Sequence, residues 1–88
     1  VYPAGASLYF TVVAAAAADP VAQWAAAKRA ASAAIVDGGG TISHHHGVGV
    51  DHRPWLEAEI GPLGVGVLRA VKDRLDPVGV LNPGVLVP

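Results

Sequence analysis

Two dipeptides, Asp19-Pro20 and Asp37-Gly38, bound the segment of this chain whose conformation is most constrained. Aspartate is a favoured helix N-cap and proline is favoured at the first helical position, whereas Asp-Gly after the last apolar residue ends a helix. The residues between them are rich in alanine, the best helix former. Their larger apolar members fall on one stripe, namely Val21, Trp24, Ala31 and Ile35. The pattern predicts an amphipathic helix over residues 20–36.

Two other segments have the alternation of β-strands. In residues 7–14, Leu8 and Phe10 fall on one face and Tyr9 on the other. Residues 41–46 begin with β-branched Thr-Ile and continue into three histidines. We expect these two strands to pair across the intervening helix, with further strands supplied by other protein, because a two-stranded sheet is marginal.

A second helical pattern begins near residue 53 and is interrupted by Gly61-Pro62, which must bend or break it. The pattern stops at Asp76-Pro77, and residues 78–88 form a turn-rich tail that should pack on something else. The resulting order is strand, helix, strand, helix, tail. The predicted fold class is therefore α+β.

The run His44-His45-His46, with glycines on both sides, is the strongest candidate for a functional site. On an extended strand His44 and His46 would share one face and His45 would occupy the other. Flanking glycines would let a large flat ligand lie against the main chain. Strand pairing would also bring Tyr9 near the histidines, where imidazole and phenol groups can exchange protons. The alternatives are a polar surface turn for the histidines and a core aromatic for Tyr9.

Composition limits the classes of function. The chain has 88 residues, enough for one small domain, with 52% hydrophobic and only 15% charged residues, so much of its apolar surface should meet other protein. A formal net charge of -1 gives no electrostatic case for nucleic acid or an anionic membrane. The absence of cysteine excludes disulfides, thiolate chemistry and cysteine-ligated metals. Heavy use of alanine, valine and glycine suggests a bacterial source.

Several short motifs in this chain occur together in one known family. They are Ser43-His44-His45-His46-Gly47-Val48-Gly49, Trp55-Leu56, Val71-Lys72, Leu75-Asp76-Pro77 and Asn82-Pro83-Gly84. From about Gly5 to its end the chain resembles the C-terminal end of FAD-linked oxidases of the vanillyl-alcohol oxidase superfamily, and its triple histidine resembles the alkyldihydroxyacetonephosphate synthases. The resemblance implies that residues 1–88 are the C-terminal part of a cap or substrate domain, with a tail returning to a separate FAD domain.

The same resemblance implies roles for individual residues. Tyr9 matches a catalytic tyrosine of the synthases. In related 2-hydroxyacid dehydrogenases the motif is Glu-His-Gly, so His46, directly before Gly47, inherits the flavin-side role, and His45 replaces the glutamate that helps to bind a metal. The predicted catalytic residues are Tyr9, His45 and His46, the cofactor-binding residues are His44, Gly47 and Asn82, and the substrate-binding residue is Arg53.

A metal site is the weaker interpretation of the histidines. His44 with His46 or His52 could supply two or three zinc ligands, but adjacent histidines on an extended strand cannot converge on one ion without bending. Asp51 is the only nearby carboxylate. We therefore predict no metal.

The resemblance implies an FAD-dependent transferase that exchanges the acyl group of acyl-dihydroxyacetone phosphate for a fatty alcohol, in ether lipid synthesis. The alternatives are an FAD-dependent 2-hydroxyacid dehydrogenase or oxidase and, from another class, a non-catalytic packing module. Implied partners are the FAD-binding domain of the same enzyme, a lipid phosphate, a fatty alcohol and a second copy in a homodimer. A cytoplasmic location is expected, with peripheral membrane association of the whole enzyme left open.

Overall fold

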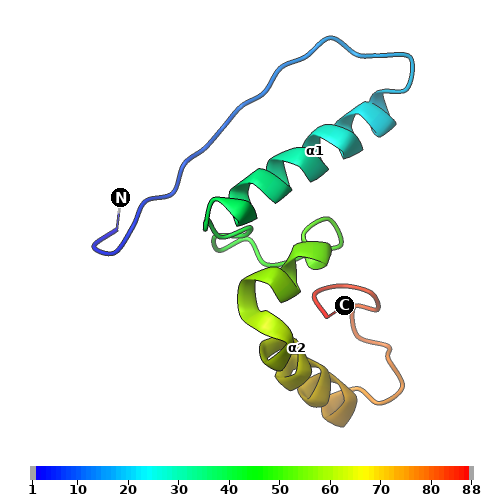
Figure 1. Cartoon of the computed structure of the whole chain (residues 1–88). Helices are drawn as coiled ribbons and strands as arrows, with labels where there is room; N and C mark the ends of the chain where they lie inside the picture. The colour runs from blue at the N-terminus through cyan, green and yellow to red at the C-terminus, as the bar shows by residue number, and fades with distance from the viewer. Residues whose placement is uncertain (1, 88) are drawn as a thin grey trace.

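The computed structural model describes residues 2–87 as two long helices joined by a loop, preceded by an extended segment and followed by a looped tail (Figure 1). Helix α1 spans Pro20–Asp37, the one-turn 3-10 helix η1 spans Arg53–Trp55, and α2 spans Leu56–Leu75. Because η1 contacts α1 and leads directly into α2, it forms the junction between the two helices.

Helix α1 confirms the first prediction, and its ends are held as the sequence indicates. The Asp19 carboxylate accepts a hydrogen bond from the backbone N–H of Ala22 at 3.0 Å. At the other end the N–H of Gly38 donates to the carbonyl of Ala34 at 3.0 Å. Capping of this kind satisfies backbone groups that the helix itself leaves unpaired.

The predicted α+β class is wrong, because no strand occurs among residues 2–87. Residues 6–17 run as an extended, unpaired segment beside α1 (Figure 1). Its large apolar side chains are 74–91% exposed: Leu8, Tyr9, Phe10, Val12 and Val13. Residues 41–46 form a bent loop instead of the second strand. Alternation alone does not make a sheet, since each strand needs the backbone groups of a neighbour, and these two segments do not pair.

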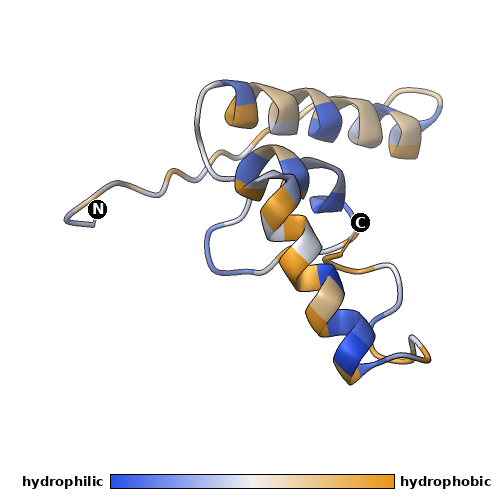
Figure 2. Cartoon of the chain, turned by 60° about the horizontal axis from the view of Figure 1, so that its bottom comes forward, coloured by the Kyte–Doolittle hydropathy of each residue, from blue (hydrophilic) through white to orange (hydrophobic). Residues whose placement is uncertain are grey.

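Helix α2 has the predicted interruption. Gly61 adopts φ 75° and ψ 165°, outside the helical region, and Pro62 follows it. Both features divide α2 into a short first part and a longer second part. The helix ends before Asp76, as predicted, and its hydrophilic residues lie toward its two ends, with an apolar stretch between them (Figure 2). None of the helices in the described part of the chain is long and apolar enough to cross a membrane.

The buried core is small. Its apolar members are Ile42 from the loop and Leu56 and Val65 from α2, which are 4–9% exposed, and Ser32 of α1 is 2% exposed. Trp24, a member of the predicted apolar stripe of α1, remains 54% exposed and lies outside this core. With so little core, single polar contacts between the loop and the helices have a large share in holding the fold.

One such contact joins the loop to α2. The Glu59 carboxylate accepts hydrogen bonds from the hydroxyl of Thr41 and from the N–H of Ile42, the latter at 3.0 Å. We expect Glu59→Gln to lower the free energy of unfolding by about 1 kcal/mol, because the charged acceptor is lost while the shape is kept. Urea denaturation measures this. The matched control is Glu57→Gln in the same turn, and an equal effect of both variants would contradict the prediction.

Candidate functional site

The three histidines lie on a tight turn. The hydroxyl of Ser43 donates a hydrogen bond to the carbonyl of Gly47 at 2.7 Å and closes the loop around them. Ring centroids lie 3.9 Å apart for His44 and His45 and 4.8 Å apart for His45 and His46. All three rings are exposed. The expected alternation between two faces is wrong, since the turn gathers the three imidazoles on one side.

Tyr2 is the aromatic residue that meets this histidine cluster. Its hydroxyl shares a hydrogen bond of 2.7 Å with Nε2 of His44, and the two ring centroids are 5.4 Å apart. Paired backbone hydrogen bonds between Tyr2 and Gly5 hold the Tyr-Pro-Ala-Gly turn that presents the ring. Sequence reasoning missed Tyr2. The one available signal was an aromatic residue at the start of a turn containing proline and glycine.

Tyr9 lies elsewhere in this structure. It is 80% exposed on the unpaired extended segment, and within residues 2–87 no hydrogen bond or ring contact joins it to the histidines. The predicted approach depended on strand pairing that does not form here. The catalytic role of Tyr9 stays a prediction.

A groove of about 530 Å³ lies between α2, the histidine loop and the tail. We call it the C-terminal groove. Its apolar side chains come mainly from one face of α2 and from the tail: Val48, Leu68, Val71, Leu75, Leu81, Val85, Leu86 and Val87. Gly47 and Asn82, two of the predicted cofactor-binding residues, also line it although they are far apart in the sequence. The predicted cofactor contacts thus share one apolar surface, whereas His44 is not among its lining residues.

The tail that forms one wall of the groove is tied to α2 by Asp76. Its carboxylate accepts hydrogen bonds from the N–H groups of Val80 at 3.0 Å and Leu81 at 2.9 Å, and from the ammonium of Lys72. The hydrogen bond from Lys72 and that from Leu81 are the main causes that lower the pKa of Asp76 from 3.8 to about 2. Asp76 is 7% exposed, so it is a buried carboxylate that holds the tail against α2.

Arg53 provides a second attachment of the tail. Its guanidinium donates a hydrogen bond of 2.7 Å to the carbonyl of Gly84. That bond uses one of the five guanidinium N–H donors, and the remaining donors are compatible with the predicted contact to a substrate phosphate. In this structure Arg53 holds the tail beside η1.

The C-terminal groove has two features that would let a flat ligand approach it closely. Gly47 adopts φ 81°, and a Cβ placed on it would meet nothing within 4 Å, so the main chain is open to close approach. Asn82, at φ 44°, brings an amide with both donor and acceptor groups to the same groove. Residues 2–87 contain no group of three or more histidine, aspartate or glutamate side chains that could hold a metal ion.

Comparison with known proteins identifies a family and several similar proteins. Residues 1–86 match the family model described as FAD linked oxidases, C-terminal domain. The chain is 44% identical over 39 residues to the probable D-lactate dehydrogenase, mitochondrial, of Danio rerio, across 44% of this chain and 8% of that protein. It is 40% identical over 43 residues to the alkyldihydroxyacetonephosphate synthase of Trypanosoma brucei brucei, across 49% of this chain and 7% of that protein. The chain thus spans less than a tenth of the length of these relatives, and no solved structure matches it.

Proposed function

Because this chain belongs to the FAD linked oxidase C-terminal domain family, we propose that it is the C-terminal part of a longer FAD-dependent enzyme. The activity we propose is exchange of the acyl group of acyl-dihydroxyacetone phosphate for a fatty alcohol. FAD, when bound, supplies the electron-accepting ring system that this chemistry needs. Gly47 and Asn82 would contact its ring edge from this chain, and the adenine and phosphate groups would be held by the rest of the enzyme.

The observation that carries this proposal is the C-terminal groove. It is lined mainly by apolar side chains and is about 530 Å³ in volume, within the range of pockets that enclose small organic ligands. An alkyl chain beside the flavin would bury its apolar surface there. The similarity to an alkyldihydroxyacetonephosphate synthase also supports a substrate with an alkyl chain.

The histidine cluster supplies the proton chemistry of the proposal. Exchange of an acyl for an alkyl group requires removal of a proton from C1 and protonation of the leaving oxygen. We assign proton transfer at the leaving and entering oxygen atoms to His45 and His46, and removal of the C1 proton to Tyr9. His44 would contact the cofactor. Three imidazoles with centroids within 5 Å of their neighbours could also pass a proton from ring to ring.

Oxidation of a 2-hydroxy acid is the second candidate, favoured by the stretch that is 44% identical to a probable D-lactate dehydrogenase. A substrate as small and polar as lactate makes no use of a large apolar groove. A non-catalytic packing module is the third candidate, and it leaves the clustered histidines without a function. We further propose that the FAD-binding domain of the same chain covers the groove and that the whole enzyme is a homodimer. We propose a cytoplasmic location for it, with peripheral contact with membranes.

The purified full-length enzyme would test the choice between the two activities. We expect release of fatty acid from acyl-dihydroxyacetone phosphate only when a fatty alcohol is present, with no net reduction of an external electron acceptor. Oxidation of D-lactate measured with a dye acceptor is the parallel assay. Acceptor reduction by D-lactate without alcohol exchange would contradict the proposal and favour the dehydrogenase.

A further inference from the structure

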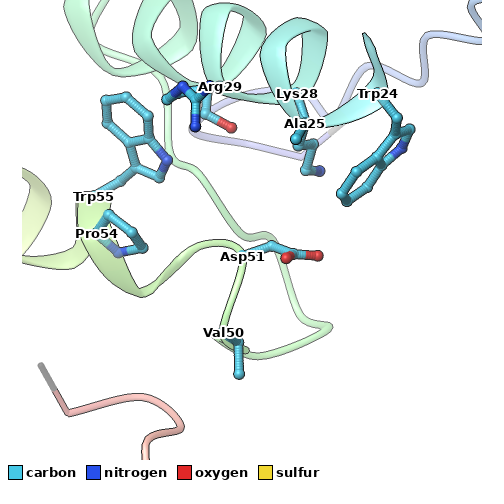
Figure 3. Close-up of a pocket in the computed structure, with 9 residues that line it drawn as sticks. Trp24, Ala25, Lys28, Arg29, Val50, Asp51, Pro54 and Trp55 are labelled. Atoms are coloured by element: carbon cyan, nitrogen blue, oxygen red, sulfur yellow. The ribbon is translucent and has the colours of Figure 1, made fainter. Parts of the chain in front are cut away.

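A second cleft, of about 200 Å³, lies between α1 and the loop that leads into η1 (Figure 3). Trp24, Lys28 and Arg29 line it from α1, and Asp51 and Trp55 line it from the opposite side. None of its lining residues belongs to the C-terminal groove. It is therefore a separate site, to which the proposed flavin chemistry assigns no role.

The charges around this cleft add up to a local excess of positive charge. Lys28 and Arg29 contribute two positive charges and Asp51 one negative charge, in a chain whose formal net charge is -1. Within residues 2–87 the one salt bridge joins Lys72 to Asp76. Lys28, Arg29 and Asp51 therefore form no ion pair with one another. A ligand with one negative charge would neutralise the cleft.

Aromatic rings flank these charges. Figure 3 shows the indole of Trp24 beside the Lys28 side chain and the indole of Trp55 at the other end of the cleft, near Arg29 and Pro54. Trp24 is 54% exposed, an apolar ring left largely open to solvent. Indole rings stack favourably against flat apolar groups, and the neighbouring cations would attract a negatively charged group on the same ligand.

We propose that this cleft binds a small monoanion with a flat apolar body, the class of which benzoate is a simple member. The carboxylate would lie between Lys28 and Arg29, and the ring would lie against an indole. The size of the ligand follows from the volume, because about 200 Å³ is below the roughly 300–1,000 Å³ of pockets for larger organic ligands. This proposal goes beyond the flavin-dependent activity and does not depend on it.

Intrinsic fluorescence tests the proposal on the chain itself, because its two tryptophans both line the cleft. Titration with benzoate should give a saturable change with a Kd on the order of 1 mM, as expected for so small a ligand. Benzamide, which has the same ring without the charge, should give none. Sodium chloride at matched ionic strength controls for screening.

Variants locate the site. Lys28→Gln and Arg29→Gln should each weaken benzoate binding by about fivefold, and Asp51→Asn should strengthen it, since a repulsive charge is removed. Arg74→Gln, an exposed cation at the end of α2, is the matched control and should leave the Kd unchanged. Circular dichroism checks that each variant keeps its helices.

Two results would overturn the proposal. One is a linear fluorescence change with benzoate, or an equal change with benzamide. The other is saturable binding that neither Lys28→Gln nor Arg29→Gln weakens. Neither result bears on the exchange activity, which is measured in the full-length enzyme with different ligands.

Discussion

Replacing His46 by alanine in the full-length enzyme is expected to lower the turnover number by about 10²–10⁴-fold, the usual contribution of a general acid or base. The fold should survive, because the ring is exposed and its neighbour in the structure is the His45 ring, with centroids 4.8 Å apart. Loss of that contact removes no core packing. Turnover should therefore fall while the melting temperature stays nearly constant.

His52→Ala is the matched control for this experiment. His52 lies outside the histidine cluster, immediately before η1, and lines neither the C-terminal groove nor the cleft beside α1. Its removal should leave turnover within about threefold of wild type. If His46→Ala remained within about tenfold of wild type, the proton-transfer role would have to move to His45 or His44.

The second large effect is expected from Asp76→Asn, which should release the tail from α2. The variant keeps the size of the side chain and loses the charge that binds the Lys72 ammonium and the N–H groups of Val80 and Leu81. Charge-assisted hydrogen bonds are the stronger ones, and three of them converge on this carboxylate. Hydrogen exchange of the Val80 and Leu81 amides should speed up by about tenfold or more.

Acid should have the same effect on the wild-type chain. Because the pKa of Asp76 is lowered from 3.8 to about 2 in the folded chain, its ionised form is favoured by folding. The stabilisation is complete above about pH 4 and is lost as the pH falls through about 2. Thermal unfolding followed across this range should show a larger loss in wild type than in Asp76→Asn, in which the contributions of other carboxylates such as Asp19 and Glu59 remain. Asp73→Asn, an exposed carboxylate one turn earlier, should behave as wild type.

Equal exchange rates in Asp76→Asn and Asp73→Asn would mean that the tail is held by other contacts, with Arg53 and Gly84 as the next candidates. The functional consequence is direct. The tail supplies Asn82 and most of one wall of the C-terminal groove, so its release should also weaken any ligand bound there.

The histidine run shows which features of a candidate site a sequence pattern can predict. The run His44-His45-His46 between glycines predicts a functional site, which stays a prediction, and the structure places the three rings close together. Their arrangement was mispredicted, because alternation assumes a strand and residues 41–46 are bent. Tyr2, which bonds His44 from 42 positions away, was not predicted by any local pattern.

The sequence by itself determined the features that depend on neighbours along the chain. Asp19 and Gly38 set the ends of α1, Gly61 and Pro62 interrupt α2, and Asp76 ends it, all through bonds or backbone angles within about four residues. Backbone preference is a local property, so the order of residues suffices to predict it.

Only the tertiary structure decided which distant residues meet. It brought Gly47 and Asn82 into one groove, joined Arg53 to Gly84 across 31 positions, and left Tyr9 exposed on an unpaired segment. Residues 7–14 have the alternation of a strand, but a strand exists only when another segment offers its N–H and C=O groups. Such pairings depend on the path of the whole chain in space, which no local pattern contains.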